Sequence, residues 1–223
     1  MYVTLITPSP ATFSIWSVIY SLLLISMIAM IIKKGDSYYQ KAVDQISKLF
    51  RISCILNIAW IVTFSFVLVE ISVLFIFGFV ITLALISIKL LEIQEGKRWL
   101  LPVSFGLYSG WLFIATIVNI NAALVKLNWS RFGFMQETWG IIMLIVAIFL
   151  LIGVVIKIRN AIFPLPIAWA YLGINQFLKS PAGFNGEFAT LQTVSLIGMS
   201  VLVIISVILF IRNHFSILPE LSK

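Results

Sequence analysis

Three stripes of aromatic and polar side chains lie within apolar stretches of this sequence, and they are its best candidates for ligand chemistry. They comprise Trp16 and Tyr20; Asn57, Trp60 and Phe64; and Trp111, Ala115 and Asn119. Spacings of three or four residues put the members of each stripe on one face of a helix. Aromatic rings with a few amides suit a flat, mostly apolar ligand. Amides in membrane helices also hydrogen-bond between helices, and this structural interpretation stays open.

Residue types that catalyse reactions or bind metals are scarce in the apolar stretches. The one histidine, His214, follows the last stretch, and the one cysteine, Cys54, has no second thiol for a disulfide or a metal cluster. The acidic residues lie in loops or at stretch ends, as Glu70 does, which argues against a proton-coupled pump. The last stretch has no lysine for a retinal Schiff base. We therefore predict no catalytic residue and no metal site.

The composition identifies the elements that must position the stripes. Of the 223 residues, 61% are hydrophobic and 10% are charged, whereas soluble domains have about 25% charged residues. The apolar stretches are long enough for helices to cross a hydrocarbon core of about 30 Å, and none alternates as a membrane β-strand does. The predicted fold is all-α, a polytopic transmembrane helical bundle. Its seven spans lie at about residues 12–32, 50–69, 71–91, 100–124, 138–157, 161–178 and 189–211.

The basic residues predict the orientation of these spans. If the amino terminus is outside and the carboxyl terminus cytoplasmic, the inside loops hold twelve of the fifteen Lys and Arg. These are Lys33, Lys34, Lys41, Lys48, Arg51, Lys89, Lys97, Arg98, Lys157, Arg159, Arg212 and Lys223, against Lys126, Arg131 and Lys179 outside. This positive-inside bias requires all seven spans, including the short sixth, which starts with Pro164 and Pro166. Residues 33–51 are predicted as the one sizeable cytoplasmic loop, with a short amphipathic turn starting within 44–49.

The stripes belong to longer motifs on the first, second and fourth spans. The motifs are Pro8-x-Pro10-x-x-Phe13-x-x-Trp16-x-x-x-Tyr20, Leu56-Asn57-x-x-Trp60-x-x-x-Phe64, and Tyr108-x-x-Trp111-x-x-x-Ala115-x-x-x-Asn119. In order and in helix assignment they resemble the TspO/MBR family, the tryptophan-rich sensory proteins related to the mitochondrial translocator protein or peripheral benzodiazepine receptor. The resemblance covers roughly residues 8–122. It departs from the family pattern at Leu24 and Leu107, where the family has glycine and proline.

The resemblance implies a membrane receptor whose pocket binds tetrapyrroles such as protoporphyrin, or sterols. On this basis Trp16, Trp60 and Trp111 would stack against a flat macrocycle. Tyr20, Asn57 and Asn119 would orient it by hydrogen bonds, and Ala115 would leave room for it. Residues 1–125 would be the TspO/MBR-like four-helix portion and residues 126–223 three additional helices. The family's first helix, which precedes its proline pair, would be missing or truncated.

Two functions from different classes follow as hypotheses. The first is a sensory, regulatory or tetrapyrrole-handling binding protein that requires no cofactor. It would not be an enzyme, although some relatives degrade porphyrin in light, which the tryptophans could support. The second is a small transporter or facilitator for an uncharged or amphipathic solute; a scaffold without a small ligand is a third option. The expected partners are the lipid bilayer of a bacterial cell membrane and a tetrapyrrole or sterol-like molecule, with no nucleic acid, and a homodimer is left open.

Overall fold

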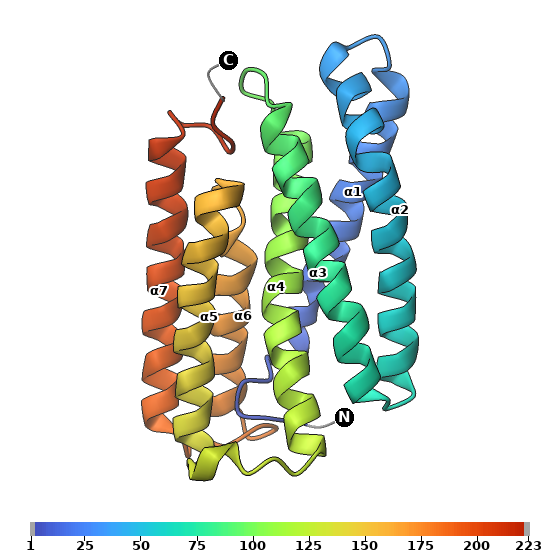
Figure 1. Cartoon of the computed structure of the whole chain (residues 1–223). Coiled ribbons are helices and arrows are strands. Elements are labelled where there is room, and N and C mark those ends of the chain that lie inside the picture. The colour runs from blue at the N-terminus through green and yellow to red at the C-terminus, as the bar shows by residue number, and fades with distance from the viewer. Residues whose placement is uncertain (1–2, 221–223) are drawn as a thin grey trace.

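The computed structural model describes residues 3–220 and forms an all-α bundle (Figure 1). Its helices are η1 (Pro10–Ser14), α1 (Ile15–Ile32), α2 (Ser37–Ser65), α3 (Val69–Glu92), α4 (Leu100–Lys126), η2 (Arg131–Gly133), α5 (Gln136–Ile158), α6 (Pro164–Lys179) and α7 (Ala189–Arg212). Consecutive α-helices run in opposite directions between the two ends of the bundle (Figure 1). The predicted fold class is confirmed, and six of the described helices are long and apolar enough to cross a membrane. The chain is an integral multi-pass membrane protein.

The helix α6 is shorter than the other membrane helices. It has 16 residues, which is about 24 Å of helix and less than the roughly 20 residues that a span needs. It nevertheless packs against α4 and α7, and its Tyr171 hydroxyl donates to the Leu144 carbonyl of α5 at 2.6 Å. Most of its side chains are buried by protein rather than exposed to lipid. The apolar run in the sequence is weak here because this short helix packs inside the bundle, where protein rather than lipid surrounds it.

The prediction of a loop over residues 33–51 was wrong, because α2 begins at Ser37. The Asp36 carboxylate caps this helix by accepting a hydrogen bond from the Tyr38 backbone N–H at 3.0 Å. Tyr38, Tyr39, Ala42 and Ile46 are buried on one side of the added turns, while polar residues occupy the other side. Such a segment has low mean hydropathy although it is a regular amphipathic helix. Hydropathy alone therefore detected only the part of α2 that lies in lipid.

The first turn of α2 is attached to the α3–α4 loop by an ion pair. Arg98 Nη1 donates to Asp36 Oδ2 at 2.8 Å, and its guanidinium lies 5.2 Å from the centre of the Tyr38 ring. Desolvation acts to raise the pKa of Asp36, but the Tyr38 N–H and the Arg98 guanidinium outweigh it and hold that pKa below its usual range. The carboxylate therefore stays ionised while it caps α2.

The helix α4 lies at the centre of the bundle and contacts α1, α3, α5 and α6. Small residues allow these helices to approach closely, as is common in membranes. A Cβ atom at Gly110 of α4 would collide with the Phe163 carbonyl and the Pro166 ring. Ser104 of α4 also lies 2.8 Å from Ser26 of α1, Oγ to Oγ. The central helix thus joins the first part of the chain to the last three helices.

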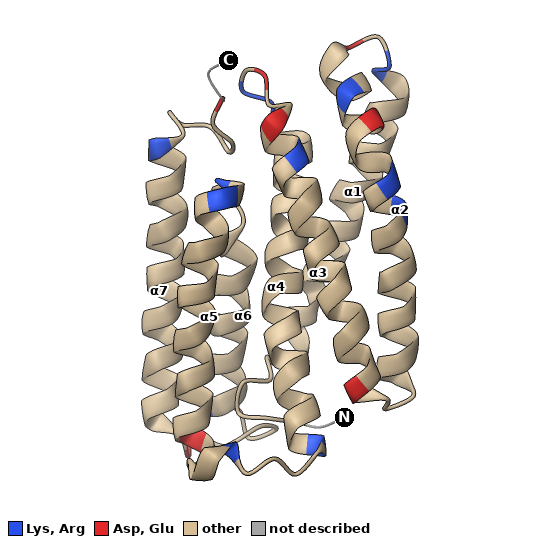
Figure 2. Ribbon diagram, in the orientation of Figure 1, with Lys and Arg blue, Asp and Glu red and all other residues tan. Residues whose placement is uncertain are grey.

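Charged residues gather at the two ends of the bundle (Figure 2). Most Lys and Arg lie at the end where α1 finishes and α2 begins, which is the end that the positive-inside count assigns to the cytoplasm. At the opposite end, Lys126 is the last residue of α4 and Arg131 is the first residue of η2. Lys223, which the count also used, is outside the described residues. The grouping of charges agrees with the predicted alternation of loops, and the assignment of sides stays a prediction.

Candidate functional site

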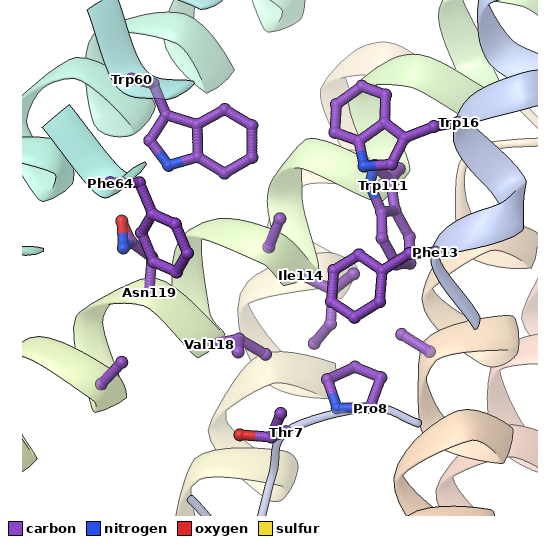
Figure 3. Close-up of a pocket in the computed structure, with 13 residues that line it drawn as sticks. Thr7, Pro8, Phe13, Trp16, Trp60, Phe64, Trp111, Ile114, Val118 and Asn119 are labelled. Carbon is purple, nitrogen blue, oxygen red and sulfur yellow. The ribbon is translucent and has the colours of Figure 1, made fainter. Parts of the chain in front are cut away.

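A cavity of about 150 Å³ lies between α1, α2 and α4 (Figure 3). Its walls are almost entirely apolar, and they come from the N-terminal segment and four helical elements in addition to α4. The lining residues are Thr7, Pro8, Phe13, Trp16, Trp60, Phe64, Trp111, Ile114, Ala115, Val118, Asn119, Ala122 and Ala170. Figure 3 shows Trp60 and Phe64 of α2 on one side, Trp16 and Phe13 on the other, and Ile114 and Val118 of α4 between them.

Five of the seven predicted ligand residues line this cavity: Trp16, Trp60, Trp111, Ala115 and Asn119. Tyr20 and Asn57 do not line it. They lie beside it, where Asn57 Nδ2 donates to the Tyr20 hydroxyl at 3.1 Å and joins α2 to α1. The structure thus brings the three sequence stripes to one place in the bundle, with the aromatic members around the cavity and this α1–α2 hydrogen bond next to it.

Aromatic rings contact one another around the cavity. Trp16 stacks on Tyr20 with ring centroids 5.2 Å apart and meets Trp60 at 6.1 Å. It also makes an edge contact with Trp111 at 6.2 Å, and Phe13 packs edge-on against Trp111 at 5.7 Å. Such aromatic pairs are each worth about 0.5–1.5 kcal/mol beyond the area they bury. Trp16 therefore sits at the centre of a connected aromatic cluster drawn from three helices.

Two indole N–H groups at the cavity have no hydrogen-bond acceptor. The Nε1 atoms of Trp60 and Trp111 are both buried without a partner, and so is the Oδ1 atom of Asn57. Trp111 is only 2% exposed, so lipid or bulk water does not supply the missing acceptor. Buried donors without partners are rare because each costs free energy. A ligand with acceptor atoms could meet these donors only by displacing the side chains that cover them.

Asn119, in contrast, is already engaged within the protein. Its amide nitrogen donates to Ser72 Oγ of α3 at 3.0 Å. Its amide oxygen lies 2.9 Å from the same hydroxyl, whose single proton is shared with the Val69 carbonyl at 2.7 Å. Ser72 is fully buried. The polar part of Asn119 therefore links α4 to α3, which is the structural interpretation that the sequence left open for membrane amides.

The N-terminal segment forms one end of the cavity because it is attached to α6. The Ser9 N–H donates to the Gly173 carbonyl at 3.0 Å, and Trp169 Nε1 donates to the Thr12 carbonyl at 2.9 Å. Gly173 faces the Thr12 side chain so closely that a Cβ atom there would collide with it. These contacts hold Pro8 and Phe13 against the cavity.

The sequence stripes omitted several lining residues. Ile114, Val118 and Ala122 each follow a member of the third stripe by three residues, so adding the i+3 neighbours of Trp111, Ala115 and Asn119 would have found them. Phe13 and Phe64 stood in the motifs without a predicted ligand role. Thr7, Pro8 and Ala170 could not be found from local spacing, because they reach the cavity only through the packing of the N-terminal segment and α6.

No group of three or more His, Cys, Asp or Glu side chains that could hold a metal ion occurs among residues 3–220. His214 lies beyond the last residue of α7, far along the chain from the cavity residues.

Comparison with known proteins supports the motif resemblance. A family model described as TSPO-like protein matches residues 1–209. The match runs past residue 122, where the motif resemblance ends, and includes α5, α6 and most of α7. No curated protein and no solved structure matches the chain. The shared motifs therefore belong to a sequence pattern that extends over nearly the whole bundle.

Proposed function

The chain belongs to the TSPO-like family, and from that premise we propose that it binds a flat, largely apolar ligand of the tetrapyrrole class in the cavity between α1, α2 and α4. Its role would be sensory, regulatory or tetrapyrrole-handling. The observation that carries the proposal is the convergence of Trp16, Trp60 and Trp111 on one cavity. Indole faces stack on flat π-systems, and ligand pockets are typically apolar with few polar groups.

The free donors of the cavity favour a ligand with acceptor atoms. Trp60 and Trp111 each have a buried N–H without an acceptor, which a ligand would reach by displacing the side chains that cover it. A tetrapyrrole carries ring nitrogens and carboxylates on an otherwise apolar disc, so it offers both a stacking surface and acceptors. Asn119 contributes shape rather than hydrogen bonds, because Ser72 already occupies its amide. The binding energy is therefore expected to come mainly from the indoles.

The size of the cavity constrains how such a ligand is held. At about 150 Å³ it is smaller than typical ligand pockets of about 300–1,000 Å³ and comparable to a cavity that holds benzene. We infer that one edge of the ligand lies between the indoles and that α1 and α2 separate to admit the remainder. The hydrogen bond between Asn57 and Tyr20 is the contact that this separation would break.

Titration with protoporphyrin IX tests the proposal. Micromolar porphyrin should quench the tryptophan fluorescence of the protein in nanodiscs, and the quenching should saturate. Trp111→Phe and Trp16→Phe should each raise the half-saturation concentration about two- to tenfold, since an aromatic pair is worth about 0.5–1.5 kcal/mol. The half-saturation concentration is the relevant readout, because removing a tryptophan also removes a fluorophore and lowers the amplitude by itself.

Trp99→Phe is the matched control. Trp99 is 60% exposed and precedes the first residue of α4, at the opposite end of that helix from Asn119. It should leave the half-saturation concentration unchanged. Absence of saturable quenching at micromolar porphyrin would reject the proposal and favour a transporter, and equal effects of Trp99→Phe and Trp111→Phe would show that porphyrin only partitions into the bilayer.

A further inference from the structure

A second hollow, separate from the tryptophan cavity, runs between α1 and α2 at the basic end of the bundle. It has a wider part of about 630 Å³ and a deeper part of about 150 Å³. Both parts are lined by Met27, Met30 and Val43, so they form one continuous groove, which we call the α1–α2 groove. Its volume falls within the range of about 300–1,000 Å³ that small-molecule sites occupy.

The walls of the α1–α2 groove are apolar and adaptable. Met27 and Met30 come from α1, Val43 and Phe50 from α2, and the deep end is closed by Phe105 of α4. Methionine side chains are flexible and polarisable, so they fit chains of variable shape. A largely apolar space between two helices, with methionines in its wall, suits an acyl chain better than a compact polar molecule.

Cationic side chains lie at both parts of the groove. Lys34 lines its wide outer part and Arg51 its deep part, while the exposed Lys48 lies on α2 between their levels. Other charges of this end are used internally, since Asp36 pairs with Arg98 and Lys41 with Glu95. No ion pair among residues 3–220 involves Lys34, Lys48 or Arg51. Their charge is therefore available to an anion.

The two helices differ in polarity along this groove. The last turns of α1 are apolar and exposed, with Ile31 at 67% and Ile32 at 74%, whereas the facing turns of α2 are amphipathic. With 29 residues, α2 is about 43 Å long and extends well past a hydrocarbon core of about 30 Å. The groove thus lies where acyl chains give way to headgroups, with apolar α1 on one side and cations around it.

We propose that the α1–α2 groove binds an anionic phospholipid. One acyl chain lies along Met30 and Met27 towards Phe105, and the phosphate meets Lys34 at the outer end. Basic pockets between membrane helices attract anionic headgroups, each nearby Lys or Arg contributing about 1 kcal/mol. Charge complementarity at Lys34, together with the apolar length of the groove, is what selects this occupant over a zwitterionic lipid.

Asp44 also lines the wide part of the groove, and it has a specific place in the proposal. Its carboxylate repels a phosphate and lowers the affinity that Lys34 provides. Replacing Asp44 with Asn should therefore strengthen binding of an anionic lipid and leave a zwitterionic lipid unaffected. This opposite sign separates a charge-selective site from a groove that only accommodates chains.

Native mass spectrometry of the full chain, released from nanodiscs with equal phosphatidylglycerol and phosphatidylcholine of identical acyl chains, measures the preference directly. The wild type should retain phosphatidylglycerol preferentially. Lys34→Gln should lower the retained phosphatidylglycerol about fivefold, the factor that about 1 kcal/mol per lysine gives, and Asp44→Asn should raise it. Lys157→Gln is the control, because Lys157 is an exposed lysine in the last turn of α5 at the same basic end of the bundle and lines neither part of the groove.

A second pair of variants tests the acyl-chain part. Met27→Trp should fill the groove and reduce retention of both lipids, whereas Ile28→Trp, at a neighbouring position that is 46% exposed, should not. Thermal unfolding in detergent without added lipid shows that each variant is folded. Equal retention of the two lipids by the wild type, or equal losses in Lys157→Gln and Lys34→Gln, would overturn the proposal. The proposal would also be overturned if the wild type formed dimers that Met27→Trp abolished, because a second copy of the chain would then occupy the groove.

Discussion

At the scale of single residues, the side chains around the tryptophan cavity divide into those that the protein already uses and those that it leaves free. The Asn119 amide donates to Ser72, and the Asn57 amide donates to Tyr20. The indole N–H groups of Trp60 and Trp111 have no acceptor. Residue type alone predicted a polar role for the amides and a stacking role for the indoles, whereas the free hydrogen-bonding capacity is found mainly on the indoles.

Ser72→Ala should separate structural and ligand roles at Asn119. Removing the hydroxyl leaves a buried amide without its partner, which costs about 1–3 kcal/mol. We expect a loss of that order in the free energy of unfolding, measured by SDS titration in mixed micelles. Protoporphyrin affinity should stay within twofold of wild type, because Asn119 contributes only its shape to the cavity wall and keeps its place there.

Ser200→Ala is the control for that experiment. Its hydroxyl is exposed and donates to the Leu196 carbonyl of its own helix, so its removal should change the free energy of unfolding by a few tenths of a kcal/mol at most. If Ser72→Ala changed the free energy of unfolding as little as Ser200→Ala, the hydrogen bond between α3 and α4 would contribute nothing to stability. Asn119 would then be better explained as a ligand residue.

At the scale of elements, a glycine, which has no side chain, allows α4 and the start of α6 to approach closely. Gly110→Ala places a Cβ atom against the Phe163 carbonyl and Pro166. Overpacking of this kind costs about 1–3 kcal/mol, and because Trp111 is the next residue, the shift should also weaken porphyrin binding. Thermal unfolding and the porphyrin titration measure the two effects together.

Gly153→Ala is the matched substitution in α5. A Cβ atom at Gly153 would have no neighbour within 4 Å, and alanine stabilises a helix interior relative to glycine by about 0.5–1 kcal/mol. It should therefore leave the protein as stable as wild type or slightly more stable, with unchanged porphyrin affinity. A Gly110→Ala protein as stable as the Gly153→Ala protein would refute the close α4–α6 contact.

The same elements show which features a sequence can predict. Apolar length predicted α1, α3, α4, α5 and α7 within a few residues, because these helices bury or expose apolar side chains on all sides. It failed for the first turns of α2, where the buried residues Tyr38, Ala42 and Ile46 alternate with exposed polar ones. Helical spacing also grouped the cavity residues of each helix. It could not place Ala170 or Pro8, since their positions depend on how α6 and the N-terminal segment pack.

At the scale of the whole molecule, charge distinguishes the two ends of the bundle. The basic residues divide the bundle into a strongly cationic end and a weakly charged end (Figure 2). The candidate sites follow this division, because the tryptophan cavity includes Ala122 near the end of α4, whereas the α1–α2 groove is at the cationic end. A ligand and a structural lipid would therefore approach the protein from opposite leaflets of the bilayer.

Cysteine accessibility tests this division and the crossing of α6 together. In a Cys54→Ala background, a cysteine at Ser37 should resist an impermeant thiol reagent added to intact cells, because positive-inside bias puts the start of α2 in the cytoplasm. A cysteine at Glu187, which is exposed in the α6–α7 loop, should be labelled. Both should be labelled after permeabilisation. Labelling at Ser37 in intact cells would reverse the orientation. If both cysteines were protected, α6 would not cross the membrane despite its burial within the bundle, and the 16-residue helix would have to be a re-entrant segment.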